Sequence, residues 1–144
     1  MSTYTAKITW KSDSPETFTK NRYTRGHEWE FDGGVSVPAS SSPQVVPRFS
    51  VAEAVDPEEA LVASASSCHM LTFLWLAATA GFNIGSYEDN ALGEMAVLED
   101  GRQWMATITL DPQIEWTGDK LPTANEIADL HHEAHRQCYI ANSI

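Results

Sequence analysis

Two cysteines are the residues of this 144-residue chain best suited to chemistry. Cys68 lies within DPEEALVASASSCHMLTFLWLAATAG and Cys138 within LPTANEIADLHHEAHRQCYIANSI, and both stretches read as helices. In a chain with no sign of secretion, thiols stay reduced and are more often reactive than structural. If the two helices cross, one thiol could attack a substrate and the other could resolve the product. The two cysteines are far apart in the sequence, so their spacing does not show whether the two side chains come into contact.

A reactive Cys68 needs something that favours its thiolate. It lies about eleven residues into its helix, and a helix dipole acts only over the first turn, so the dipole cannot ionise this thiol. Arg48, in the loop before the helix, is the nearest candidate cation, and Glu58 is the obvious carboxylate to orient its guanidinium. The alternative is structural: a buried apolar cysteine, and an ordinary surface ion pair or cap.

The spacing of Glu58 and Cys68 limits how such a site could form. Ten residues on one straight helix correspond to about 15 Å along its axis, which neither side chain can cover. If Arg48, Glu58 and Cys68 share a site, a second subunit with an antiparallel helix is the simplest solution. The apolar residues 70–80 would then supply the interface.

The histidines offer a different interpretation. His131, His135 and Cys138 fall on one face of a helix and His69 follows Cys68, which is a conceivable zinc constellation. However, HHEAH (residues 131–135) has one residue too few between its glutamate and last histidine for HExxH, and no C-x-x-C is present. We therefore expect no metal site, and expect the histidines, His132 included, to pack, cap or lie at an interface.

Composition predicts one soluble domain of residues 1–144. The formal net charge of −11 disfavours nucleic acid and anionic membrane as partners. The N-terminus has no basic segment followed by an apolar one, so we expect no secretion and a cytoplasmic location. The longest apolar run, MLTFLWLAATAGF, is too short for a membrane span and indicates a buried helix. No internal repeat or domain linker is visible.

The first third of the chain predicts strands and a long loop. Residues 4–10 alternate apolar and polar side chains, the period of a half-buried strand. Residues 12–15 predict a turn, and residues 16–31 one or two more strands that end before Asp32-Gly33-Gly34. Residues 35–50 are rich in serine and proline and read as an irregular connection, which in a compact domain is often functional.

The remainder predicts a helix, strands and a second helix. Asp56, Pro57 and Glu59 are typical of a helix start and Gly81 of a stop, which gives a helix over about residues 57–80. Residues 83–116 read as β-structure with a hairpin at Asp100-Gly101, and Asp111-Pro112 ends or bulges its second strand. A second helix begins near Thr123, with Ile127, Leu130, Ala134 and Cys138 in its buried stripe. The order is that of an α+β protein.

Several of these segments resemble the OsmC/Ohr family of thiol-dependent hydroperoxide reductases. PEEALVASASSCHM resembles the first cysteine helix of that family, and AHRQCYIANSI resembles the second. Arg48-Phe49, ten residues before Glu58, stands where the OsmC branch has its active-site arginine. The order of strands and helices agrees over essentially the whole chain. His69-Met70-Leu71 and the histidine-rich second helix differ from well-known members and suggest a separate subgroup.

The resemblance implies an intertwined homodimer whose antiparallel sheets wrap two central cysteine-bearing helices, with two active sites at the subunit interface. Cys68 would be the peroxidatic thiol and Cys138 the resolving thiol, with Arg48 and Glu58 activating Cys68 and positioning the peroxide. Organic hydroperoxides would be reduced to alcohols through a Cys68 sulfenic acid and a Cys68–Cys138 disulfide, which an external dithiol reduces. No metal, flavin or haem is needed.

Two further expectations accompany this activity. An apolar pocket would favour organic peroxides over hydrogen peroxide, and its candidate residues are Phe49, Met70, Phe73 and Trp75. The alternatives are a non-catalytic protein of the same fold that binds an apolar small molecule at the dimer interface, and a metal-binding protein that uses the histidines.

Overall fold

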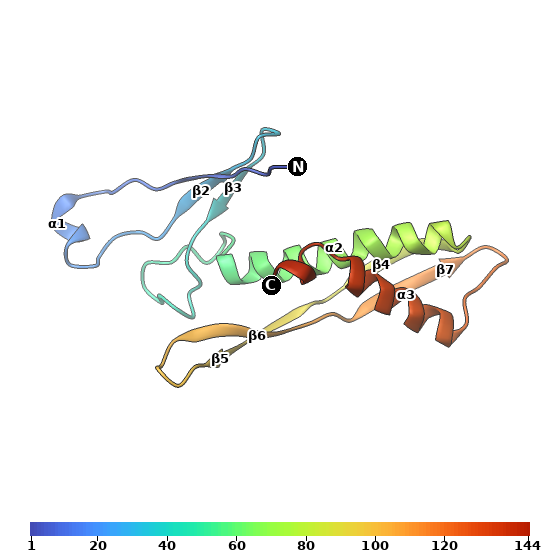
Figure 1. Cartoon of the computed structure of the whole chain (residues 1–144). Coiled ribbons are helices and arrows are strands. Elements are labelled where there is room, and N and C mark those ends of the chain that lie inside the picture. The colour runs from blue at the N-terminus through green and yellow to red at the C-terminus, as the bar shows by residue number, and fades with distance from the viewer. The chain divides into compact units, whose positions relative to one another are not determined.

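The computed structural model describes residues 1–144 and divides into two compact units, Met1–Ala60 and Leu61–Ile144 (Figure 1). The element order is strands, helix, strands, helix, which confirms the predicted α+β class. The prediction of one domain over residues 1–144 stays a prediction.

The first unit is built on a three-stranded antiparallel sheet in the order β1-β2-β3. Its elements are β1 (Lys7–Thr9), α1 (Pro15–Phe18), β2 (His27–Glu30) and β3 (Ser36–Ala39). The strand predicted over residues 4–10 is shorter than its alternation suggested, because only Lys7, Ile8 and Thr9 have partners on β2.

Two elements of the first unit differ from the prediction. Residues 12–15 do not simply turn: Ser14 caps a short helix, α1, and its hydroxyl accepts a hydrogen bond from the Glu16 N–H. The region read as an irregular loop contains β3, although Pro38 lies inside it. Proline is tolerated there because β3 is the edge of its sheet, where a missing N–H costs no ladder bond.

Helix α2 (Pro57–Thr79) begins and ends close to the predicted positions. The Asp56 carboxylate accepts a hydrogen bond from the Glu59 N–H at 2.8 Å, and the Glu59 carboxylate accepts one from the Asp56 N–H at 2.9 Å. This reciprocal pair is the expected capping box. After the helix, Gly81 has φ +87°, a left-handed conformation that favours glycine at a helix stop.

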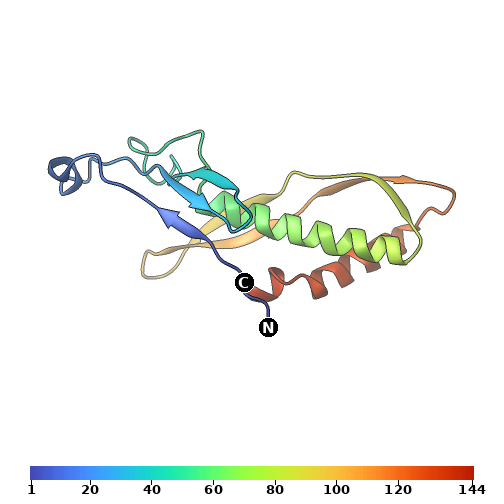
Figure 2. The same ribbon diagram turned by 90° about the horizontal axis from the view of Figure 1, so that it is seen from above.

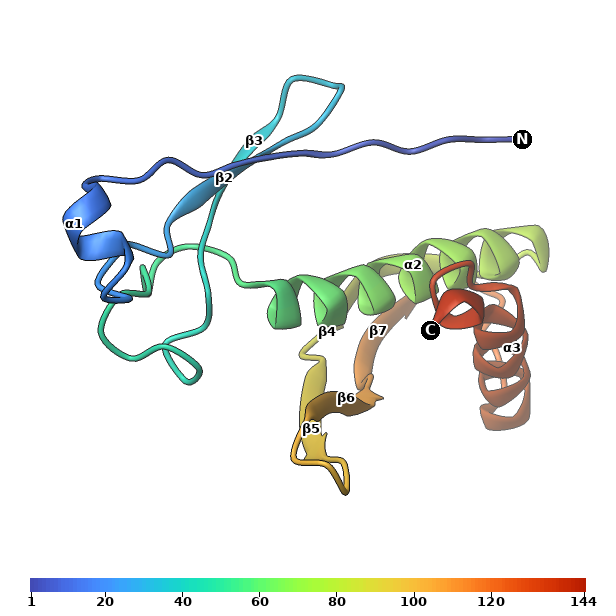
Figure 3. The same cartoon turned by 60° about the vertical axis from the view of Figure 1, so that its left-hand side comes forward.

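Two antiparallel strand pairs form a long ribbon beside α2 in the second unit (Figures 1 and 3). Its strands are β4 (Asn83–Asp89), β5 (Leu92–Val97), β6 (Gln103–Thr109) and β7 (Pro112–Thr117), with β4 paired to β7 and β5 paired to β6. The predicted hairpin is confirmed, and Gly101 takes φ +88° at its tip. The predicted break at Asp111-Pro112 is also confirmed, and the Asp111 N–H there donates to the Asp89 carboxylate at 2.7 Å.

Helix α3 (Ala124–Gln137) lies beside α2 and is followed by the short 3-10 helix η1 (Ala141–Ser143), as Figure 2 shows from above. Thr123 and Glu126 form its capping box, as predicted. The placement of Cys138 within the helix was wrong. Cys138 is the residue that ends α3, with extended backbone angles of φ −66° and ψ 116°. Its predicted burial is confirmed, since it is only 1% exposed.

The core of the second unit lies between the two helices and β4 and β7. Its buried members are Phe73 and Ala77 of α2 and Ala134 of α3, together with Phe82 after α2. Partly buried apolar side chains from the ribbon pack against them, namely Ile84, Tyr87, Ile114 and Trp116. The hydrophobic burial of this group holds α3 against α2. It therefore places the C-terminal end of α3 beside α2.

Helix α2 also carries large apolar side chains that this chain leaves exposed. Leu71 is 61% exposed and Trp75, four residues later, is 62% exposed. By length and composition alone α2 meets the requirement for a membrane-spanning helix, a requirement that the core helices of soluble proteins also meet. The apolar run was predicted to be buried, and within the chain it is buried on one side only.

Candidate active site

The two thiols of the chain meet where α3 ends beside the middle of α2. Cys68 is half-buried on α2 and Cys138 is buried at the end of α3, and both are free cysteines. Their side chains form a hydrogen bond in which the Cys138 thiol donates to the Cys68 sulfur. The open question of whether the two cysteine segments meet is therefore answered: residues 70 apart in the sequence are hydrogen-bonding neighbours.

The surroundings of Cys68 favour its thiolate. Burial opposes ionisation, but hydrogen bonds from the Cys138 thiol and from the backbone N–H groups of Ile140 and Tyr139 outweigh it. The pKa of Cys68 is therefore lowered from its ordinary value. A thiolate is the nucleophilic form of cysteine, so the lowered pKa makes Cys68 the more readily ionised thiol of this pair.

Cys138 has the opposite tendency. Burial and the hydrogen bond to Cys68 raise its pKa, although the Ala141 N–H donates to its sulfur at 3.4 Å. The same hydrogen bond, from the Cys138 thiol to the Cys68 sulfur, lowers the pKa of Cys68 and raises that of Cys138. Of the two thiols, Cys68 is therefore the one that loses its proton first as the pH rises.

The donors that sequence reasoning missed are backbone groups. It concluded correctly that the start of α2 is too distant to ionise Cys68, and it turned to Arg48 for a cation. The structure adds that the turn between α3 and η1 directs the N–H groups of Tyr139 and Ile140 at Cys68 and that of Ala141 at Cys138. The early end of α3 makes this turn possible. In the sequence, the small residues ANS after Ile140 mark this turn.

A pair of stacked histidines lies in the same helix–helix contact. The imidazoles of His69 and His131 stack with ring centres 5.3 Å apart, and Nε2 of His69 lies 3.0 Å from Nδ1 of His131. Phe73 stacks on His131 at 4.2 Å. Burial lowers the pKa of both histidines, and neighbouring His131 and His135 lower that of His69 further. The expectation that histidines pack is confirmed for these two.

The histidines do not assemble a metal centre. No group of three or more histidine, cysteine, aspartate or glutamate side chains is placed so that it could hold a metal ion. His132 and His135 are exposed on α3, whereas His131 is turned toward α2. The helix-face pattern of His131, His135 and Cys138 is disrupted because Cys138 has left the helix.

The other predicted site residues are Arg48, Glu58 and the candidate pocket residues. Arg48 is exposed in the loop before α2 and Glu58 lies half-buried in the first turn of α2, both within the first unit, so their action on Cys68 stays a prediction. Phe73 was predicted to line a substrate pocket, and this was wrong, because it is fully buried in the core. Met70 is half-buried and Trp75 is exposed.

Comparison with known proteins identifies the family. The family model described as OsmC-like protein matches residues 50–144. The chain belongs to the OsmC-like family. An OsmC-like protein of unknown function from Vibrio cholerae O1 biovar eltor str. N16961 is 47% identical, with a TM-score of 0.96 over 100% of this chain and 94% of that chain. The predicted resemblance and the OsmC/Ohr fold are confirmed.

More distant OsmC-like structures share the fold. An organic hydroperoxide resistance protein from Elizabethkingia anophelis is 17% identical, with a TM-score of 0.69 over 99% of this chain and 88% of that chain. The organic hydroperoxide resistance protein OsmC from Legionella pneumophila is 16% identical, with a TM-score of 0.64 over 100% and 91%. No curated protein matches the chain.

Proposed function

We propose that this OsmC-like protein is a thiol-dependent peroxidase that reduces organic hydroperoxides to alcohols. The observation that carries the proposal is the pairing of two thiols with opposite proton preferences: the pKa of Cys68 is lowered and that of Cys138 is raised. A nucleophilic thiolate beside a protonated partner is the arrangement that a two-cysteine peroxidase requires. The names of the fold relatives from Elizabethkingia anophelis and Legionella pneumophila support the same substrate class.

The reaction proceeds in three steps. The Cys68 thiolate attacks the terminal oxygen of ROOH, the O–O bond breaks, and the leaving alkoxide takes a proton from water to become an alcohol. Cys68 is oxidised to a sulfenic acid. The Cys138 sulfur then attacks the Cys68 sulfur, which forms an S–S bond and releases water. An external dithiol reduces the disulfide by thiol–disulfide exchange and completes the cycle.

Arg48 and Glu58 complete the proposed site from a second subunit. Helix α2 is unbroken from Pro57 to Thr79, so Glu58 and Cys68 of one chain are separated by about 15 Å of helix axis. An antiparallel α2 from a partner would bring that partner's arginine and glutamate to the thiol. The guanidinium would stabilise the charge that develops on the leaving oxygen, and the carboxylate would orient the guanidinium.

The test is consumption of cumene hydroperoxide with dihydrolipoamide as reductant, followed by ferrous-oxidation assay. Wild-type protein should turn over, and Cys68→Ser should lose all turnover because it lacks the nucleophile. Cys138→Ser should react once and then stop with a sulfenic acid on Cys68 that dimedone traps. Mass spectrometry of the wild type after one equivalent of peroxide should show a single intramolecular disulfide.

Asp129→Asn is the matched control, because it changes an exposed residue of α3 and leaves both thiols in place. It should keep wild-type turnover. Full turnover by Cys68→Ser, or absence of turnover by the wild type on every organic hydroperoxide and dithiol offered, would remove the proposed activity.

A further inference from the structure

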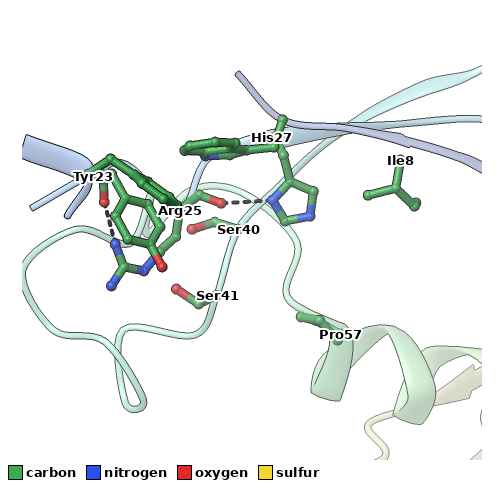
Figure 4. A pocket seen from close by; sticks show the side chains of 9 residues that line it. Ile8, Tyr23, Arg25, His27, Ser40, Ser41 and Pro57 are labelled. Atoms are coloured by element: carbon green, nitrogen blue, oxygen red, sulfur yellow. Dashed lines mark hydrogen bonds between the residues drawn. The ribbon is translucent and has the colours of Figure 1, made fainter. Parts of the chain in front are cut away.

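The first unit contains an open cavity whose lining includes neither cysteine. Its volume is about 510 Å³, and all nine residues that line it lie between Ile8 and Pro57 (Figure 4). Cavities of roughly 300–1,000 Å³ are the usual size for small-molecule sites. The question is therefore which small molecule the walls of this cavity would favour.

One wall is aromatic. Trp10, Phe18 and Tyr23 pack on one another, with ring centres 5.5 Å apart for Trp10–Phe18 and Trp10–Tyr23 and 4.9 Å apart for Phe18–Tyr23. Trp10 directly follows β1, Phe18 is the last residue of α1, and Tyr23 lies in the loop before β2. Because the three rings hold one another in place, they present a preformed apolar surface to a ligand.

Arg25 adds a fixed positive charge to this wall. Its guanidinium carbon lies 3.5 Å from the centre of the Tyr23 ring, and one N–H group donates to the Tyr23 carbonyl at 2.6 Å. Figure 4 shows this guanidinium held against Tyr23, with Ser41 close to it in that view. A guanidinium carries five N–H donors, so further donors remain for an anionic group.

His27 contributes aromatic surface without charge. Its Nδ1 lies 2.7 Å from the Arg25 carbonyl, and its Nε2 accepts a hydrogen bond from the Trp29 indole at 3.1 Å. Nε2 must therefore be unprotonated, and the proton is on Nδ1, which gives a neutral ring. The cavity lining contains no acidic side chain, so the guanidinium of Arg25 is its one formal charge.

We propose that this cavity binds a small apolar carboxylate, with its hydrocarbon or aromatic part on the Trp10–Phe18–Tyr23 wall and its carboxylate on Arg25. The rings match an apolar chain and the guanidinium matches a carboxylate. A cationic ligand of the same shape would be repelled. The chain as a whole carries a net charge of −11, which disfavours anions elsewhere on its surface and makes the local charge of Arg25 decisive.

Isothermal titration calorimetry of the full chain with octanoate, octanol and octylamine tests the proposal. Octanoate should bind saturably, with octanol weaker by about tenfold and octylamine weaker still, because only the carboxylate pairs with the guanidinium. Arg25→Gln should weaken octanoate by a similar factor and leave octanol unchanged. Arg22→Gln, an exposed arginine outside the cavity lining, is the matched control and should bind octanoate as the wild type does.

The comparison of the three probes on wild-type protein keeps the test valid even if Arg25→Gln fails to fold. Equal binding of octanoate and octanol, or no saturable binding of octanoate, would overturn the proposal. The same titration of the Cys68→Ser/Cys138→Ser double variant should be unchanged. Binding in that variant separates the cavity from the proposed peroxidase, since the double variant has no thiol with which to turn over peroxide.

Discussion

At the scale of single residues, the ionisation of Cys68 depends on a small number of donors. Two of them are backbone N–H groups, of Tyr139 and Ile140, and one is the thiol of Cys138. The backbone donors survive side-chain substitution, whereas the thiol donor does not. Replacing Cys138 therefore isolates what one side-chain hydrogen bond contributes to the reactivity of Cys68.

We predict that Cys138→Ala raises the pKa of Cys68 above its value in the wild type, because one donor to the thiolate is lost. The measurement is the pH dependence of Cys68 alkylation by iodoacetamide, followed by peptide mass. The midpoint should move to higher pH. Tyr139→Ala is the control, since it removes an exposed side chain and keeps the N–H group, and its midpoint should stay at the wild-type value. Identical midpoints for Cys138→Ala and wild type would contradict the assigned hydrogen bond.

At the scale of elements, β5 passes close to α2 at Gly93. A Cβ atom on Gly93 would lie 2.5 Å from Cγ2 of Val62 and 2.8 Å from the Met105 sulfur. Methionine can move aside, but the β-branched valine on α2 is stiff. We predict that Gly93→Ala lowers the free energy of unfolding by about 1–3 kcal/mol through overpacking.

Urea denaturation monitored by circular dichroism measures this effect. Gly33→Ala is the matched control, because a Cβ there would meet nothing within 4 Å and the backbone does not need a positive φ. It should be neutral or slightly stabilising. If Gly93→Ala and Gly33→Ala unfold at the same urea concentration, β5 does not approach α2 closely enough to exclude a methyl group at Gly93.

The elements also show which features the sequence could and could not predict. The caps of α2 and α3 and the Asp100-Gly101 hairpin were predictable because each depends on residues close together in the chain. The strand β3 was not, because Pro38 argues against a strand unless the edge position is known. The end of α3 was missed because the spacing of apolar residues predicts which side chains are buried and not where the helix ends. Cys138 is buried as that spacing predicts, although its backbone is extended.

The candidate site also has features that the sequence could predict and features that it could not. The importance of Cys68 and Cys138 was predictable from residue type and from the resemblance. Their contact depends on how α3 packs on α2 through Phe73 and Ala134, which no local pattern encodes. The donors from Tyr139 and Ile140 were invisible because they are main-chain groups, which every residue except proline carries.

At the scale of the whole molecule, the exposed apolar face of α2 and the position of Glu58 on the same helix support a dimer with shared sites. Leu71 and Trp75 lie one turn apart and are more than half exposed in the single chain. A second copy packed on this face would bury them, and the hydrophobic gain is the driving force for such association. The same packing would supply the partner's Arg48 and Glu58 to Cys68.

Complementation between two inactive variants tests this sharing directly. Arg48→Gln keeps Cys68, and Cys68→Ser keeps Arg48, so each homodimer should lose peroxidase turnover. In a heterodimer, purified through different tags on the two chains, one site combines an intact Cys68 from one chain with an intact Arg48 from the other. We predict about half of wild-type turnover for this heterodimer, because one of its two symmetric sites is complete. A site contained within one chain would leave the heterodimer as inactive as its parents, and a monomer in sedimentation at micromolar concentration would contradict the dimer itself.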